Sequence, residues 1–231
     1  MKTLGIIGGI GPESTIDYYK LFISLYRKKK DDGSYPSFII NNIDMKKMLE
    51  LISEERYIQT ADFMVEEIKK LANAGADFGL ISSNTPHIVF DLIKEKSPIP
   101  LISIVEIACN YAKSIEIERA GLLGTKFTML GGFYQKTFLQ NKIDIEIPNS
   151  NDVEIIHNRY MNELVKGKLL PETKKYFLSV VDKLINERDI NCLILGGTEL
   201  PLLLRDKYYR GIELIDTTRL HVEEAIKETF S

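Results

Sequence analysis

The sequence of 231 residues has no tryptophan, only two cysteines and only three histidines. Cys109 falls in a helical pattern and Cys192 begins an apolar run, so their spacing fits neither a metal site nor a disulfide framework. We expect both to be small buried hydrophobic side chains. The scattered histidines add no ligand cluster. The sequence therefore predicts no metal site.

Long hydrophobic runs are also missing. No stretch approaches the ~20 apolar residues that a membrane span needs, and the first residues lead directly into an apolar strand instead of a signal peptide. The net charge is −3 and the isoelectric point is about 5.8, so no basic surface for nucleic acid is indicated. We expect a cytoplasmic protein without a membrane or nucleic-acid partner.

The segments that are present alternate between short apolar runs and longer helical patterns. The expected strands are residues 4–7, 37–41, 78–81, 101–102, 120–123, 143–147, 192–195 and 214–215. The expected helices are residues 14–28, 57–74, 88–94, 105–114, 132–140, 152–165, 171–188 and 218–229. Short, nearly all-apolar strands separated by helices indicate an α/β fold with mostly parallel sheets covered on both faces.

A faint internal repeat suggests two lobes. Residues 4–11 and 120–125 both run from a strand into a turn of small residues, and a helix carrying a tyrosine follows each. We expect two pseudo-symmetric lobes of the Rossmann or flavodoxin kind, each with a mostly parallel sheet flanked by helices. The first lobe is predicted to span residues 1–98 plus 213–231, and the second lobe residues 99–212.

Two polar turns follow strands in corresponding places of the two halves. Residues 82–87 read Ser-Ser-Asn-Thr-Pro-His, and residues 196–201 read Gly-Gly-Thr-Glu-Leu-Pro. Ligands of open parallel sheets bind outside the carboxyl ends of the strands. Lobes that face each other by those edges would therefore enclose a cleft between Ser83 and Gly197.

The first polar turn carries groups suited to a compact zwitterion. The hydroxyl and amide side chains of Ser83, Asn84 and Thr85 can bind a carboxylate and an ammonium group. The alternative is that they cap the helix that follows, because Ser, Asn and Thr are also common helix caps. His87 lies one turn further on and is either a base or a structural histidine.

The second polar turn contributes Thr198 and Glu199. Glu199 is a candidate general base, a partner for a substrate ammonium group, an orienting residue, or a capping carboxylate at a helix N-terminus. Hydroxyl groups recur at another strand end, where Thr125 and Thr128 flank Lys126. We count these three residues and Thr198 among the candidate substrate-binding residues.

A glycine-rich turn follows the first strand. Gly9 and Gly11 fit the beginning of a dinucleotide fingerprint, but Ser14 occupies the position of its third glycine. The simpler interpretation is that this turn and the following helix present backbone N–H groups to a carboxylate. A tight connection with no ligand role is the alternative. Gly9, Gly11 and Ser14 are therefore candidate substrate-binding residues.

Taken together, these segments resemble the aspartate/glutamate racemase family of cofactor-independent amino-acid racemases. The matching motifs lie in residues 8–15, 74–77, 84–87, 122–129 and 196–203. The resemblance implies two pseudo-symmetric α/β lobes, often as a homodimer, and a small amino acid or related carboxylate as ligand. It also implies that no pyridoxal phosphate (PLP) is used. One cysteine would remove the Cα proton of the substrate, and a second would return a proton from the other face.

Those two cysteines would fall at positions 83 and 197, where this chain has Ser83 and Gly197. A serine hydroxyl is a far weaker acid than a thiol, and glycine has no side chain. Three functions stay open at this point. The chain is a racemase-family isomerase with other bases, a one-face lyase or hydrolase with Glu199 or His87 as base, or a non-catalytic carboxylate-binding protein.

Overall fold

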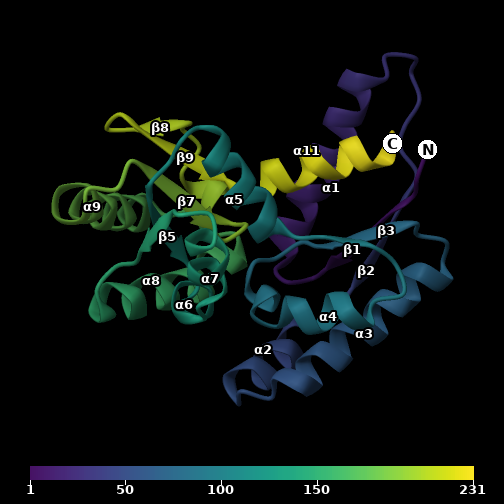
Figure 1. The fold of residues 1–231 in the computed structure, drawn as a ribbon, viewed down its shortest axis with the longest axis horizontal. Helices are drawn as coiled ribbons and strands as arrows, with labels where there is room; N and C mark the ends of the chain where they lie inside the picture. Colours follow the sequence, from purple (N-terminus) through teal and green to yellow (C-terminus); the bar gives the residue numbers. More distant parts are fainter. The chain divides into compact units, whose positions relative to one another are not determined.

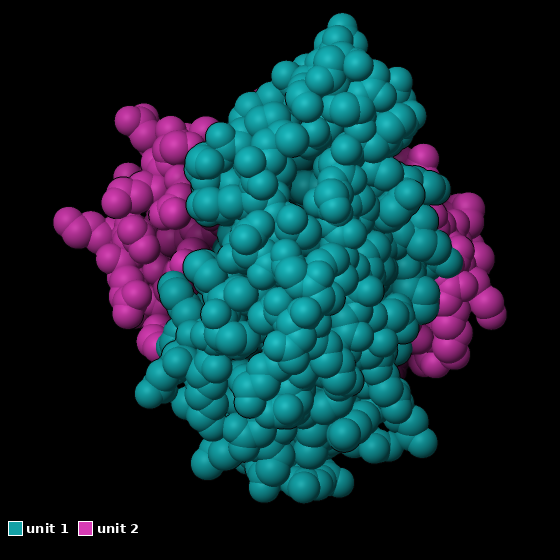
Figure 2. All heavy atoms as spheres, turned by 90° about the vertical axis from the view of Figure 1, so that its right-hand side faces the viewer, with its two compact units in different colours: residues 1–104, 218–231 teal, residues 105–217 magenta.

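The computed structural model describes residues 1–231, which divide into two compact units. Unit 1 comprises residues 1–104 and 218–231, and unit 2 comprises residues 105–217 (Figure 2). Each unit holds its own β-sheet, so each is described by itself (Figure 1).

The sheet of unit 1 has four parallel strands in the order β2-β1-β3-β4. Their bounds are β1 (Leu4–Gly8), β2 (Phe38–Asn42), β3 (Phe78–Ile81) and β4 (Leu101–Ile102). The helices are α1 (Pro12–Lys29), α2 (Met45–Ser53), α3 (Tyr57–Asn73), the 3₁₀ turn η1 (Thr85–Val89), α4 (Phe90–Lys96) and α11 (Thr217–Thr229). In the central register, Leu4 lies opposite Phe38 on one side and Phe78 on the other.

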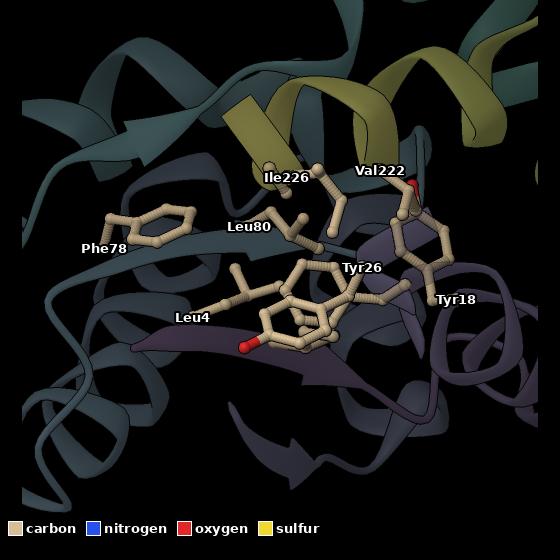
Figure 3. Packing of buried hydrophobic residues seen from close by; sticks show 10 residues of the cluster. Leu4, Tyr18, Tyr26, Phe78, Leu80, Val222 and Ile226 are labelled. Atoms are coloured by element: carbon tan, nitrogen blue, oxygen red, sulfur yellow. The ribbon is translucent and has the colours of Figure 1, made fainter. Parts of the chain in front are cut away.

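The period of two along the strands sorts the unit 1 core into two layers. Alternate residues of β1 and β3 join the apolar faces of α1 and α11 in one buried cluster (Figure 3). Its members are Leu4, Ile6, Tyr18, Phe22, Tyr26, Phe78, Leu80, Val222, Ala225 and Ile226. On the other face, a Cβ at Gly5 would lie 2.9 Å from Ala76 Cβ and 3.1 Å from Leu71 Cβ. The end of α3 therefore packs directly on the backbone of β1.

The sheet of unit 2 has five strands in the order β6-β5-β7-β9-β8, of which only β8 is antiparallel to its neighbour. The strands are β5 (Arg119–Gly124), β6 (Asp144–Glu146), β7 (Cys192–Gly196), β8 (Tyr208–Tyr209) and β9 (Ile212–Asp216). The helices are α5 (Ile104–Ser114), α6 (Lys126–Leu130), α7 (Phe133–Leu139), α8 (Ser150–Asn162), the 3₁₀ turn η2 (Leu164–Lys166), α9 (Pro171–Arg188) and α10 (Leu200–Leu203).

The two sheets repeat one topology. The order β2-β1-β3-β4 in unit 1 corresponds to β6-β5-β7-β9 in unit 2. The predicted fold class, with two pseudo-symmetric, mostly parallel sheets flanked by helices, is therefore confirmed. It follows that β3 and β7 occupy equivalent places, and that the polar turns after them are equivalent as well.

The units divide at other residues than the sequence indicated. The predicted first lobe included residues 213–231, but β9 pairs in parallel with β7 and belongs to the sheet of unit 2. The predicted second lobe began at residue 99, but β4 pairs with β3 in unit 1. The sequence of a short apolar strand does not indicate which sheet the strand joins. Only its hydrogen bonds to neighbouring strands show this.

We predict that the unit 1 cluster dominates the stability of that unit. Leu80→Ala removes a side chain that is 1% exposed and should lower the free energy of unfolding by about 2–5 kcal/mol, because a cavity is left behind. Leu92→Ala is the matched control, since Leu92 is 36% exposed on α4 and its loss should cost about 0.5 kcal/mol or less. Urea denaturation measures both, and equal losses would contradict the packing described.

Candidate functional site at the strand ends

The glycine-rich turn between β1 and α1 has a fixed backbone. Gly9 has a φ of +84°, and a Cβ there would lie 2.6 Å from the carbonyl oxygen of Ile43, so the position requires glycine. Thr15 Oγ1 accepts a hydrogen bond from Gly9 N at 2.9 Å and donates to the Gly11 carbonyl at 3.2 Å. The geometry of the turn therefore accounts for the glycine at position 9. A substrate role for Gly9 and Gly11 stays a prediction.

Buried hydroxyls connect this turn to the end of β3. Ser14 Oγ donates to the Ser82 carbonyl at 3.0 Å, and Ser82 Oγ donates to the Ile7 carbonyl at 2.9 Å. The structure thus brings the glycine-rich turn and the first polar turn together. The proton of the Ser14 hydroxyl is used for this link, so any ligand would meet only the oxygen lone pairs of Ser14.

Ser83, Asn84 and Thr85 follow β3 and are all buried, with Ser83 7% exposed. Asn84 is the N-cap residue of η1, but its side chain makes no capping hydrogen bond. Capping therefore does not account for the Asn84 amide, and a ligand role for this residue stays a prediction. Ser83 occupies the position at which the resemblance implies the first cysteine.

His87 holds the polar turn in place. Its Nε2 lies 3.3 Å from the Ile104 backbone N–H, which can only donate, so Nε2 is the acceptor and Nδ1 carries the proton. Nδ1 then donates to the Ser83 carbonyl at 3.1 Å. Burial, followed by the charge of His221, lowers the pKa of His87 to about 3. With both nitrogens bound to backbone, this geometry favours the structural role over that of a base.

In unit 2, a pair of hydroxyls lies at the end of β5. Thr125 is the N-cap of α6: its Oγ1 accepts from Thr128 N at 3.2 Å, and the two hydroxyl oxygens are 3.2 Å apart. A Cβ at Gly196 would lie 3.2 Å from Thr128 Cγ2, so this pair adjoins the end of β7. Lys126 lies between these two threonines in sequence, but its ammonium group forms an ion pair at 3.4 Å with the exposed Glu154 on α8.

The aromatic ring of Tyr160 lies directly against Gly197. A Cβ at this position would lie 2.5 Å from the phenol oxygen of Tyr160, 2.6 Å from its Cε2 and 2.8 Å from its Cζ. Side chains do not approach that closely, so Tyr160 occupies the space into which a cysteine at position 197 would project. The second position implied by the resemblance is therefore filled by a residue from another element.

Tyr160 and Glu199 form a buried hydrogen-bonded pair. The phenol donates to Glu199 Oε2 in a short hydrogen bond, and its oxygen accepts from Glu199 N at 3.3 Å. Thr198 Oγ1 also donates to Glu199 Oε2, at 3.2 Å. Burial, and then the negative charge of Glu199, raise the pKa of Tyr160 well above its ordinary value, so the phenol stays protonated. Glu199 makes no side-chain cap to α10, so the capping alternative does not describe it.

Tyr160 was not among the residues predicted from sequence. It lies on α8 in a stripe with Val153 and Ile156, all three buried. Apolar residues at such helical spacing are typical of core packing. The sequence signal is therefore that of an ordinary buried aromatic, and nothing in it indicates contact with Gly197.

The two cysteines lie outside these turns. Cys192 begins β7 and Cys109 lies in α5, and both are fully buried. Burial raises the pKa of Cys192 to about 12 and also raises that of Cys109. Neither side chain is a thiolate at neutral pH, as the sequence indicated.

Other parts of the molecule offer little alternative. A surface hollow of about 690 Å³ includes none of the strand-end residues and is lined by Tyr19, Lys20, Ile23, Ser24, Arg27, Lys28 and Asp31. No group of three or more His, Cys, Asp or Glu side chains is placed to hold a metal ion. None of the helices is long and apolar enough to cross a membrane.

Comparison with known proteins places these turns in context. The model of the family described as Asp/Glu/Hydantoin racemase matches residues 7–225, which is nearly the whole chain. The chain belongs to this racemase family. The match includes both polar turns and the glycine-rich turn, so the resemblance inferred from their motifs is confirmed at the level of the family.

Individual relatives cover the chain along its length. The broad specificity amino-acid racemase RacX of Bacillus subtilis is 24% identical in an alignment of 228 positions that covers 93% of this chain and 92% of that protein. An aspartate racemase homologue from Pyrococcus horikoshii is 31% identical, with a TM-score of 0.83 over all of both chains. A putative Asp/Glu racemase from Yersinia pestis is 27% identical, with a TM-score of 0.87 over all of both chains.

We predict that the buried histidines make unit 1 sensitive to acid. The pKa values of His87 and His221 are lowered to about 3 and about 4, mainly by burial. Below about pH 6.5 these two histidines bind protons in the unfolded chain but stay neutral in the folded chain. The free energy of unfolding therefore falls as the pH falls from 6.5 toward 4. His87→Gln should flatten this dependence between about pH 6.5 and 5 in urea denaturation. An unchanged slope would show that His87 titrates normally when folded.

We also predict that positions 160 and 197 are energetically coupled. Gly197→Ala should lower the free energy of unfolding by about 1–3 kcal/mol, because the new methyl group meets the Tyr160 ring. Tyr160→Ala opens that space at the cost of a cavity. The double variant should therefore lose less than the sum of the two, by about 0.5–3 kcal/mol. Additive losses in urea denaturation would mean that the ring does not confine position 197.

Proposed function

We propose that this chain is an amino-acid isomerase of the racemase family that inverts the Cα centre of a small amino acid without PLP. In this proposal the polar turns after β3 and after β7 each carry groups that act on an amino acid, and the active form is a homodimer. Hydroxyl and carboxyl groups perform the acid–base chemistry that the resemblance assigns to two thiols.

The observation that supports the proposal is the equivalence of the two polar turns. β3 and β7 have the same place in the two sheets, and each ends in buried polar side chains. Ser83 and Asn84 follow β3, while Thr198 and Glu199 follow β7. Inverting a carbon centre requires removal of a proton from one face and its return to the other, and two equivalent turns suit that requirement.

The groups of unit 1 are suited to holding the substrate carboxylate. The glycine-rich turn is fixed by Thr15, and α1 begins directly after it without a side-chain cap at Gly11. The N-terminus of a helix favours an anion because its backbone N–H groups and dipole point toward it. Asn84 and Ser83 then supply neutral polar groups beside it, which agrees with a zwitterion as ligand.

A second candidate function is supported by one specific observation. Position 197 carries no side chain, and Tyr160 fills the adjoining space. A protein that has lost a thiol from each turn can keep an amino-acid site and bind without inverting, or can act on one face of the substrate only. The test must therefore separate binding, one-face exchange and inversion.

We predict that the purified chain exchanges the Cα proton of at least one small amino acid. Single enantiomers of the common amino acids are incubated in D₂O, and NMR follows the Cα signal while a chiral separation follows the configuration. Isomerisation gives deuterium at Cα together with inversion. Exchange with full retention identifies a one-face enzyme and contradicts the proposal.

The same panel of amino acids is measured by thermal denaturation. A ligand that binds the folded chain raises its melting temperature. Stabilisation by an amino acid without any Cα exchange would establish a binding protein in place of an isomerase. Asn84→Ala is the accompanying variant, and it should weaken the stabilisation if the turn after β3 holds the ligand.

A further inference from the structure

The contact between Tyr160 and Gly197 identifies a group that the family pattern does not supply. The backbone after β7 bears no side chain at position 197, and the phenol oxygen of Tyr160 lies 2.5 Å from where a Cβ would be. A sulfur at this position would lie one bond further from the backbone, in the region that the phenol occupies. An oxygen that can donate and accept a proton thus takes the place of the second thiol.

We propose that Tyr160, hydrogen-bonded to Glu199, is the acid–base group of unit 2 that replaces the second thiol. This inference rests on the proposed function and deepens it, because it names the group that serves one face of the substrate. The geometry shows why Glu199 belongs to this group. The phenol oxygen lies between the position of the missing side chain and a carboxylate that accepts its proton.

The proton balance is complete within the pair. In one direction the phenol oxygen takes the Cα proton of the substrate while the phenol proton passes to Glu199 Oε2, which leaves a carbanion and a neutral carboxyl group. In the other direction the phenol protonates the carbanion and recovers its proton from Glu199. Inversion is completed when the carbanion takes a proton on the opposite face. The step moves protons only, so it needs no oxidant or reductant.

The surroundings hold the pair in this arrangement. The Glu199 backbone N–H donates to the phenol oxygen, and the Thr198 hydroxyl donates to the same carboxylate oxygen that the phenol binds. Both contacts hold the carboxylate and the phenol oxygen against each other. Glu199 acts through Tyr160 in this scheme and is a positioning and proton-storing residue.

The test compares Cα deuterium exchange from each enantiomer separately in wild type and Tyr160→Phe. The variant keeps the ring that fills the space beside Gly197 and loses only the hydroxyl. We expect inversion to stop and exchange to fall at least about 100-fold for one enantiomer, while the other enantiomer, which loses its proton from the opposite face, still exchanges. A merely structural role would lower both equally.

Two further variants complete the experiment. Glu199→Gln still accepts a hydrogen bond but cannot take the proton, and it should lower exchange of the same enantiomer as Tyr160→Phe. Tyr176→Phe is the matched control, because this tyrosine lies on α9 with its hydroxyl bound to Asp152 and should leave both rates unchanged. If Tyr160→Phe folds poorly, Glu199→Gln carries the comparison.

The outcomes separate this inference from the proposed function. If the wild type exchanges, and Tyr160→Phe and Glu199→Gln change the exchange of both enantiomers equally, the inference is overturned and the isomerase stands. Loss confined to one enantiomer supports both. A wild-type chain that exchanges no amino acid overturns both, and stabilisation by the same amino acids then identifies it as a binding protein.

Discussion

Parallel strand pairing is the constraint on which every feature of the candidate site depends. The register that aligns β1 with β3 brings the glycine-rich turn beside the turn after β3, and the Ser14–Ser82 hydrogen bond joins them. In unit 2 the same pairing places Gly124 opposite Gly196, so that the hydroxyls after β5 adjoin the end of β7. Because parallel strands end at one edge, polar residues far apart in sequence form a half-site in each unit.

Much of this arrangement could be predicted from sequence, because it is a local property of strand–turn–helix units. Apolar runs marked the central strands, and polar residues after them marked the turns. The assignment of β9 to a sheet could not be predicted, since a buried strand has the same pattern in either unit. Tyr160 was missed for a related reason: helical spacing shows that a side chain is buried, but not which backbone it lies against.

The contact between Tyr160 and Gly197 also alters how the missing thiol is understood. From sequence alone, a glycine in place of a cysteine is a simple loss of a functional group. In the structure the space is filled by a ring whose hydroxyl is bound to Glu199. A cysteine at position 197 would require the Tyr160 ring to move or to be replaced by a smaller side chain, so each of the two positions limits what the other can carry. The family's fold is kept while the space beside one strand end is filled by a side chain from helix α8.

The two remaining cysteines give this arrangement a chemical consequence. Oxidation and alkylation of proteins proceed mainly through accessible thiolates. Cys109 and Cys192 are buried, and burial raises the pKa of both, so neither offers a thiolate to a peroxide or an alkylating reagent. The strand-end turns hold hydroxyl, amide and carboxylate groups instead, which such reagents leave intact. The turns after β3 and β7 therefore carry no side chain that a mild change of redox state would convert.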